Sequence, residues 1–299
     1  MALKKRIIGQ DEAVECLCRR LLMGYVNLTK RRGPLAVLLF LGPTGVGKTE
    51  LARSLAEFLF GSDSQMIRFD MSEYMEEHSV AKLIGSPPGY VGHEEEGQLT
   101  GKLRTKPYSV VLFDEIEKAH LKIFDLFLQL FDEGRLTDSK GRTADGRNAI
   151  FIMTSNIGAE KKERRMGFGE PVTQEKDTAI NYELKNRFRP EFINRIDEVI
   201  VFKSLNEEIV RKILRPMLDE ICENLEKQHQ VRLQIAEEVE EFVVQAGYSP
   251  QYGVRELRRA VEKLIQAPLS SLILSGEIKQ YTSWQIVRKD QWLSIIPHI

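Results

Sequence analysis

The stretch Gly42-Pro43-Thr44-Gly45-Val46-Gly47-Lys48-Thr49 stands between an apolar run, Val37 to Leu41, and an amphipathic segment. This order predicts a strand, a glycine-rich loop and the first turn of a helix. Glycines let such a loop curl so that its N–H groups and the positive end of the helix face a phosphate. Lys48 then reaches the β and γ phosphates of a nucleoside triphosphate, and Thr49 offers its hydroxyl to Mg²⁺. The stretch therefore predicts a nucleotide site.

Five short apolar runs are predicted to be strands, and helical patterns separate them. Near-continuous apolar strands that alternate with helices are typical of an α/β fold, with a parallel five-stranded sheet and helices on both faces. Ligands of such sheets bind beyond the carboxyl ends of the strands. On the helix after the loop, we expect Leu51, Leu55, Phe58 and Leu59 to face the sheet. The five runs are Val37 to Leu41, Met66 to Asp70, Val110 to Phe113, Ile150 to Thr154 and Val199 to Phe202.

The pattern changes after Phe202, which predicts a large domain over residues 1–203 and a smaller one over 204–299. Ser204-Leu205-Asn206-Glu207 is a candidate capping box that opens a helix to about Gln228. The smaller domain is predicted to be mostly helical α+β. Its remaining predicted elements are a strand near Val231 to Ile235 and helices over Glu237 to Ala246 and about Gly253 to Leu274.

The composition is that of an ordinary water-soluble protein. Forty-three basic and forty-four acidic side chains nearly cancel, so no global field favours nucleic acid or an anionic membrane. The three cysteines, Cys16, Cys18 and Cys222, make neither a disulfide framework nor a metal quartet. No apolar run has the length to cross a bilayer, and Met1 to Gln10 lacks the core of a secretion signal. We expect a cytoplasmic location, with an organelle matrix as the alternative.

A second signature follows the run Val110 to Phe113, which ends in the carboxylate pair Asp114-Glu115. A buried strand would deliver both carboxylates beside the phosphate loop. Asp114 would hold Mg²⁺ through its water shell, and Glu115 would polarise the attacking water. Asn156 follows the next strand and could aim its amide at the same water. The alternative for Asn156 is a turn or helix-cap asparagine.

At this point the chain resembles AAA+ ATPases of the Clp family, and in particular the second ATPase module of ClpB and ClpC. The resemblance covers nearly the whole chain. It implies the AAA+ fold with a small lid domain, ATP and Mg²⁺ as cofactors, and hydrolysis of ATP coupled to protein unfolding. It rests on the phosphate loop, Asp114-Glu115, and the segments Ile7-Ile8-Gly9-Gln10, Met153-Thr154-Ser155-Asn156, Arg189-Pro190-Glu191-Phe192-Ile193-Asn194-Arg195-Ile196-Asp197 and Gly253-Val254-Arg255.

The resemblance assigns roles to individual residues. Asn156 would be the first sensor, which orders the attacking water. Arg195 resembles the arginine finger that reaches into a neighbouring subunit's site, and Arg255 the second sensor, which touches the γ phosphate from the small domain. Ile7 and Ile8 resemble the segment that packs on adenine. Without the motif context, either arginine would be taken for a surface charge and the isoleucines for core residues.

The segment Gly85-Ser86-Pro87-Pro88-Gly89-Tyr90-Val91-Gly92 resembles the pore loop of the family. In a homo-hexamer, Tyr90 with Val91 would line an axial channel and pull unfolded or tagged protein substrates through it. The alternative is that Tyr90 folds back onto its own domain. Gly134 to Gly146 resembles a second, more polar pore loop, and a solvated turn is the alternative.

Met166-Gly167-Phe168-Gly169 bears on a further partner. Protease-linked Clp ATPases carry a hydrophobic-Gly-aromatic loop here that docks on a ClpP-type peptidase, and ClpB-type disaggregases lack it. The segment therefore favours a ClpC-like chain, with a buried Phe168 as the alternative.

Two other classes are weighed against this interpretation. A nucleic-acid-remodelling AAA+ ATPase should show a basic tract, and the near-zero net charge argues against it. A non-hydrolysing nucleotide switch would be expected to lack Glu115 or Arg195, and both are present. A ClpB-like disaggregase without a peptidase partner remains the nearest alternative.

Overall fold

The computed structural model describes residues 2–26, 32–86, 96–157, 180, 182–249 and 253–298. The chain divides into two compact units, and each is described by itself. The first comprises Met1–Pro43 and Gly47–Phe202, and the second comprises Thr44–Val46 and Lys203–Ile299. Among the residues described, no helix has the length and apolar character needed to span a membrane.

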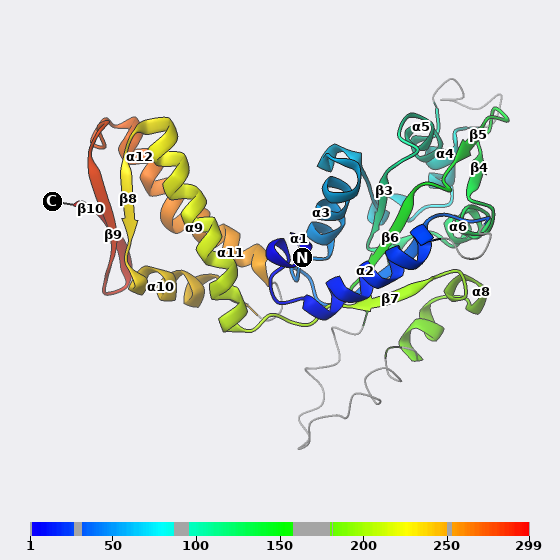
Figure 1. Cartoon of the computed structure of the whole chain (residues 1–299), viewed down its shortest axis with the longest axis horizontal. Coiled ribbons are helices and arrows are strands. Elements are labelled where there is room, and N and C mark those ends of the chain that lie inside the picture. Colours follow the sequence, from blue (N-terminus) through cyan, green and yellow to red (C-terminus); the bar gives the residue numbers. More distant parts are fainter. Residues whose placement is uncertain are drawn as a thin grey trace, which may run out of the picture. The chain divides into compact units, whose positions relative to one another are not determined.

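The first unit is built on a five-stranded sheet with the order β2-β3-β6-β1-β7, in which every pairing is parallel (Figure 1). The predicted five-stranded parallel sheet is thus confirmed. All residues of β1, β3 and β6 are buried, because both faces of the central strands are covered. The strands are β1 (Ala36–Leu41), β2 (Met66–Asp70), β3 (Val110–Asp114), β6 (Ile150–Ser155) and β7 (Glu198–Val201).

Helices cover both faces of this sheet. The helices α2 and α3 lie on one face, and α6 lies on the other (Figure 1). A short antiparallel hairpin, β4 (Arg135–Thr137) with β5 (Thr143–Asp145), follows α6. The helices whose bounds are fully described in this unit are α1 (Ala2–Arg6), α2 (Asp11–Val26), α3 (Lys48–Phe60), α4 (Ser79–Ile84), α5 (Gln98–Thr105), α6 (Leu121–Glu133) and α8 (Pro190–Ile193), with 3-10 turns η1 (Asp63–Gln65), η2 (Met71–Tyr74) and η3 (Ile116–Lys118).

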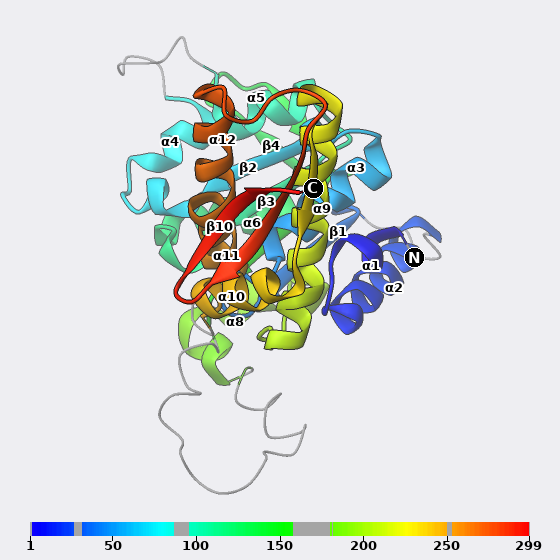
Figure 2. The ribbon, with the colours of Figure 1, turned by 90° about the vertical axis from the view of Figure 1, so that its left-hand side faces the viewer.

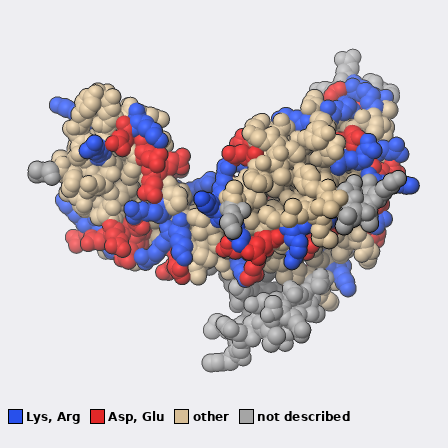
Figure 3. Space-filling view, viewed as in Figure 1, with Lys and Arg blue, Asp and Glu red and all other residues tan. Residues whose placement is uncertain are grey.

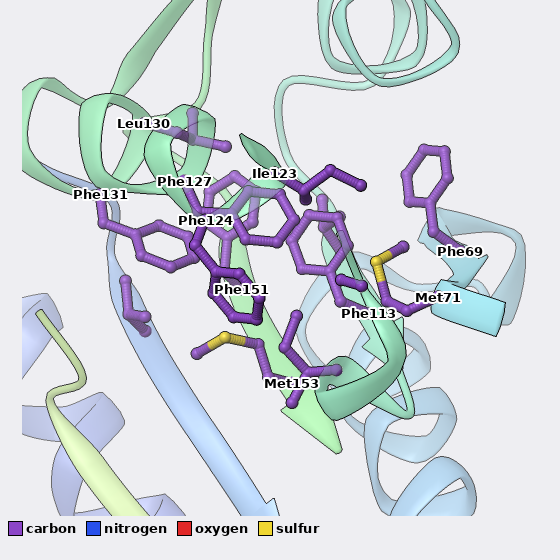
Figure 4. Packing of buried hydrophobic residues seen from close by; sticks show 14 of the residues in the cluster. Phe69, Met71, Phe113, Ile123, Phe124, Phe127, Leu130, Phe131, Phe151 and Met153 are labelled. Carbon is purple, nitrogen blue, oxygen red and sulfur yellow. The ribbon is translucent and has the colours of Figure 1, made fainter. Parts of the chain in front are cut away.

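An aromatic cluster fills the space between the sheet and α6 (Figure 4). Phe113 of β3 lies 4.3 Å from Phe127 of α6 and 6.1 Å from Phe151 of β6, measured between ring centroids. Such ring pairs stabilise a core by about 0.5–1.5 kcal/mol each beyond the area that they bury. The cluster fixes β3 and β6 beside each other just before the ends that carry the candidate site.

The prediction for α3 was partly wrong. Leu51 and Leu55 are buried, but Phe58 is 62% exposed. The buried stripe of this helix includes the small residues Ala52 and Ala56. At about 100° per residue, Phe58 falls on the same side of the helix as Leu51, so its exposure goes with its place in the last turn, two residues before α3 ends at Phe60.

The second unit combines helices with a three-stranded sheet of order β10-β9-β8 (Figure 2). It is a mostly helical α+β unit, as predicted, although the sequence prediction missed β9 and β10. Strand β9 is parallel to β8 and antiparallel to β10. Its elements are α9 (Glu207–His229), β8 (Arg232–Ile235), α10 (Glu237–Gly247), α11 (Val254–Val261), the π-helical turn η5 (Glu262–Gln266), α12 (Ala267–Leu274), β9 (Ser283–Lys289) and β10 (Trp292–Pro297).

Two local predictions in this unit need correction. The N-cap of α9 is Asn206, whose Oδ1 accepts the N–H of Ile209 at 2.9 Å, and not Ser204. Asparagine caps a helix as well as serine does, so the helix begins two residues later. The single helix predicted over Gly253 to Leu274 contains the π-helical turn η5 just before Pro268, which has no N–H to continue the regular hydrogen bonding.

Candidate nucleotide site

The glycine-rich loop leaves β1 with three glycines in the left-handed region. The φ angles are 146° at Gly42, 75° at Gly45 and 103° at Gly47. A Cβ on Gly42 would lie 2.7 Å from the carbonyl oxygen of Phe202, so a side chain has no room there. Gly47 is the N-cap residue of α3, which begins at Lys48. The sequence therefore produces the curled backbone and helix start that a phosphate group requires.

Lys48 joins this loop to the end of β6. Its side chain is held inward, with 8% of the residue exposed. The Nζ donates hydrogen bonds to the carbonyl oxygens of Gly42 at 2.5 Å and Pro43 at 2.9 Å, and to the Oδ1 of Asn156 at 2.9 Å. Two residues predicted separately for one site thus contact each other.

Asp114 ends β3 and is held from two sides. Its Oδ2 accepts hydrogen bonds from the Nε of Arg68 at 3.1 Å and the Nη2 at 2.6 Å, and its Oδ1 accepts one from the Oγ1 of Thr154 at 2.5 Å. Each carboxylate oxygen has about two lone-pair directions, so these contacts leave acceptor capacity for metal-bound water. Asp114 is therefore held in one orientation and can still accept a hydrogen bond from metal-bound water.

Glu115 has an unusual backbone conformation for a residue with a side chain, with φ 56° and ψ 52°. Its N–H donates to the Oγ1 of Thr154 at 3.0 Å, and its carbonyl oxygen accepts the N–H of Lys118 at 2.9 Å. Its Oε2 lies 2.5 Å from the Nζ of Lys118, and this hydrogen bond raises the pKa of Lys118. Because the backbone turns left-handed at Glu115, the side chain of Glu115 leaves the main chain in a different direction from that of Asp114.

Glu117 fixes the main chain of Asn156. The N–H of Asn156 donates to the Oε1 of Glu117 at 3.2 Å. The amide side chain of Asn156 is directed toward the Nζ of Lys48.

The donor set fits magnesium. Mg²⁺ prefers oxygen ligands and keeps several of its waters. Thr49 offers a hydroxyl in the first turn of α3, which follows β1. Asp114 offers a carboxylate at the end of β3, and β6 lies between β1 and β3 in the sheet. When bound, the ion would neutralise the charge of the β and γ phosphates.

Ile7 lies close to the phosphate loop, as the adenine-packing prediction requires. It is buried, and its Cγ2 lies 3.9 Å from where a Cβ on Gly47 would stand. Ile8 follows it and is half-buried. Arg6 at the end of α1 pairs with Glu57 of α3, which ties the isoleucine segment to the helix of the phosphate loop.

Of the two candidate arginines, only Arg195 belongs to the same unit as this cluster. Arg195 follows α8 and precedes β7, so it lies at the amino-terminal edge of the sheet, opposite the carboxyl ends that carry the cluster. Its side chain is 39% exposed and pairs through Nε with Asp132 of α6. Arg255 is exposed on α11 of the second unit. The other predicted contact residues, Tyr90, Val91, Met166, Gly167 and Phe168, lie outside the described residues.

Sequence reasoning missed three residues of the cluster. Arg68 is a single cation in the otherwise apolar start of β2, and that contrast was a usable signal. Thr154 is a polar residue near the end of an apolar strand, within a segment quoted above only for its resemblance. Glu117 follows the carboxylate pair in a charged stretch, where nothing in the sequence distinguishes it from a solvated residue.

Comparison with known proteins bears directly on this geometry. Residues 33–199 match the family model of the AAA domain (Cdc48 subfamily), and residues 205–286 match that of the C-terminal, D2-small domain, of ClpB protein. A ClpA homolog of Porphyra purpurea, described as an ATP-dependent Clp protease ATP-binding subunit, is 52% identical over 283 residues, covering 92% of this chain and 34% of that protein. The chloroplastic chaperone protein ClpC1 of Arabidopsis thaliana is 51% identical over 288 residues, covering 93% of this chain and 31% of that protein.

The chain spans about a third of the length of these relatives. The AAA model alone covers more than half of the chain, and the ClpB-type small domain follows it directly. The chain therefore belongs to the AAA+ ATPases of the Clp family.

Proposed function

We propose that the chain is the ATP-hydrolysing module of a protein unfoldase that threads polypeptides through an axial pore. One observation carries the proposal: Lys48 contacts Asn156, and Asp114 and Glu115 share Thr154, all at the carboxyl ends of three strands of one sheet. In this proposal residues 1–203 form the ATPase domain and 204–299 the lid domain.

Five side chains have separate roles in hydrolysis. Lys48 and the N–H groups of Thr44 to Thr49 hold the phosphates of ATP. Thr49 and, through water, Asp114 hold Mg²⁺. Glu115 polarises the attacking water and Asn156 orients it, because phosphoryl transfer depends on positioning and charge stabilisation more than on covalent chemistry.

In the proposed homo-hexamer, a neighbouring subunit would supply an arginine to the ATP site. The exposed Arg195 would act in the site of a neighbouring subunit of a homo-hexamer, and Arg255 would touch the γ phosphate from the small domain. A trans-acting arginine contributes about 10³ to 10⁵ in rate. The position of Arg195 at the sheet edge opposite Lys48 supports action on a neighbour's nucleotide.

Substrates and partners follow from the family. Tyr90 and Val91 would grip unfolded or tagged protein, and Met166 to Phe168 would dock on a ClpP-type peptidase. The Porphyra purpurea relative is described as the ATP-binding subunit of an ATP-dependent Clp protease, which supports the peptidase as a partner. The match of the small domain to that of ClpB favours the second candidate, a disaggregase without a peptidase.

A nucleic-acid substrate has little support. Acidic and basic side chains are interspersed over the face seen in Figure 3 and leave no large basic area there. The relatives named above include a chloroplastic protein, so we propose an organelle matrix or the cytoplasm as the compartment.

Steady-state ATP hydrolysis tests this proposal. We expect turnover that requires Mg²⁺, that an unfolded protein stimulates and that single-stranded DNA does not. Glu115→Gln should still bind ATP but hydrolyse it at least about 10²-fold more slowly. Stimulation by DNA alone, or full turnover by Glu115→Gln, would overturn the proposal.

A further inference from the structure

Thr154 has two hydrogen bonds that meet on one oxygen. Its Oγ1 donates to the Oδ1 of Asp114 at 2.5 Å and accepts the N–H of Glu115 at 3.0 Å. The residue is 1% exposed, so water does not compete for either bond. One hydroxyl thus contacts both members of the carboxylate pair.

The position of this contact follows from the sheet. The parallel pairing of β3 with β6 ends at Phe113 and Met153. Beyond that pair, the Glu115 backbone turns left-handed, and the side chain of Thr154 takes its N–H in place of a strand carbonyl. The hydroxyl therefore extends the sheet by one hydrogen bond at the point where the chain must turn.

A threonine is well suited to hold Asp114 and Glu115 in this way. A β-branched side chain in a strand has few χ1 rotamers, so the direction of the threonine hydroxyl is set before any ligand binds. The second oxygen of Asp114 is held independently by Arg68 of β2. Asp114 is thereby clamped between β2 and β6.

We propose that Thr154 is a positioning residue that sets both carboxylates of the ATPase site. Through its donor bond it aims Asp114 toward the magnesium-bound water, and through its acceptor bond it holds the backbone turn that points Glu115 at the attacking water. The inference rests on the proposed function, in which these carboxylates act on metal and water. Residues that orient metal ligands in this way typically change metal affinity or activity by 10- to 100-fold when they are lost.

The test compares three substitutions at one position in the full chain. Thr154→Val keeps the shape and removes the hydroxyl. Thr154→Ser and Thr154→Ala both remove the methyl group, and only the serine keeps the hydroxyl. We expect Thr154→Val and Thr154→Ala to lower kcat about 10- to 100-fold and to raise the Mg²⁺ concentration at half-maximal rate, and Thr154→Ser to stay within a few-fold of the parent.

A binding measurement separates positioning from general damage. Affinity for a fluorescent ATP analogue in EDTA should be unchanged in every variant, because Lys48 and the loop are intact. The gain in affinity on adding Mg²⁺ should shrink in Thr154→Val and Thr154→Ala alone. Thr100→Val is the matched control, since Thr100 of α5 is also fully buried and its Oγ1 donates to the carbonyl oxygen of Gly97, the N-cap residue of that helix.

The outcomes are distinguishable. If the parent hydrolyses ATP, Glu115→Gln does not, and the alanine and serine variants have equal kcat and Mg²⁺ dependence, the positioning role is overturned while the proposed function stands. If Glu115→Gln hydrolyses ATP like the parent, the proposed function itself fails. If Thr154→Val does not fold, the comparison of alanine with serine decides the question alone.

Discussion

The Nζ of Lys48 donates a hydrogen bond to the Oδ1 of Asn156 at 2.9 Å, so the first residue of α3 and the residue that follows β6 contact each other through side chains. The main-chain N–H of Asn156 is held in turn by Glu117. Asn156 is therefore placed to influence Lys48 and, in the proposed function, the attacking water that it would orient. These two effects can be separated by substitution.

Replacing Asn156 with alanine should slow hydrolysis without weakening binding. We expect kcat to fall about 10²-fold with KM within a few-fold, because the orienting amide is lost while the side chain of Lys48 that would bind phosphate is retained. Asn156→Asp should instead weaken binding of ATP about tenfold, since a carboxylate beside Lys48 competes with the phosphates. Steady-state kinetics and nucleotide titration measure the two effects. Equal ATP affinity in the aspartate and alanine variants would contradict the contact as described.

Arg195 and Lys48 should complement each other between subunits. Arg195→Ala and Lys48→Ala should each be nearly inactive as pure proteins. Mixing them should restore part of the ATPase rate, because a chain with an intact Lys48 can sit beside a chain with an intact Arg195. The assay is hydrolysis as a function of the mixing ratio. A mixture no more active than its components would reject the trans-acting role.

Arg189→Ala is the control for that experiment. Arg189 is also exposed and pairs with an aspartate of α6, its Nη1 lying 3.1 Å from the Oδ1 of Asp125. Loss of an exposed ion pair changes stability by only about 0–1 kcal/mol. Arg189→Ala should therefore hydrolyse ATP like the parent, and a loss as large as that of Arg195→Ala would point to a general effect of removing surface arginines.

Asp197 should be among the more important charges for the stability of the large unit. Its Oδ1 lies 2.7 Å from the Nη2 of Arg20, with the side chains 18% and 13% exposed, and its Oδ2 accepts the N–H of Val37 at 2.7 Å. These bonds join α2 to the starts of β1 and β7. Asp197→Asn leaves Arg20 nearly buried without its partner charge, and should cost about 3 kcal/mol of unfolding free energy.

Urea unfolding at neutral pH measures this cost. Glu15→Gln is the control, because Glu15 pairs with Lys4 on the surface and should change the free energy of unfolding by about 0.5 kcal/mol or less. If both variants unfold at the same urea concentration as the parent, Asp197 does not hold the elements together as its contacts indicate.

Asp138 should make stability depend on pH. It lies in the turn after β4, where its Oδ1 accepts the N–H of Arg142 at 2.8 Å and its Oδ2 accepts bonds from the side chains of Arg142 at 2.9 Å and Arg104 at 3.0 Å. Burial alone would raise the pKa of Asp138, but these bonds outweigh it and the pKa is lowered. The predicted second pore loop therefore uses this carboxylate for its own turn.

The sign of the effect follows from the lowered pKa. The ionised carboxylate stabilises the fold above the ordinary aspartate pKa of about 3.9, and this stabilisation is lost as the pH falls through the lower folded value. Asp138→Asn should cost about 2 kcal/mol at pH 7 and progressively less toward pH 3. Thermal unfolding across this range measures the difference, and a cost that grows on acidification would refute the explanation.

Much of the fold could be predicted because its signals are local. The five strands are short apolar runs, and each predicted run lies within one residue of the observed strand. The missed strands β9 and β10 are different: Trp284, Gln285, Val287, Ser294 and their neighbours mix polar and apolar residues, because this sheet is only partly buried. Without a clear period, the pattern did not reveal them.

The residues of the candidate site that belong to recognisable sequence motifs could be predicted. Lys48, Asp114, Glu115 and Asn156 stand at fixed places relative to strand ends, and the chemistry of phosphate binding requires those residue types. Arg68 and Thr154 act on Asp114 from neighbouring strands, across distances in sequence of 46 and 40 residues. Such contacts depend on strand order and register, which apolar runs alone do not define.

The most direct test of the account follows a stable fluorescent protein with an unstructured tail while ATP hydrolysis is measured in the same sample. Unfolding of a protein stabilised by about 5–15 kcal/mol requires repeated, coordinated turnover. We predict loss of fluorescence with the parent chain, and with Tyr90→Ala continued hydrolysis without loss of fluorescence. Hydrolysis by an assembled parent that leaves the tailed protein folded, or unfolding that persists in Tyr90→Ala, would contradict the account.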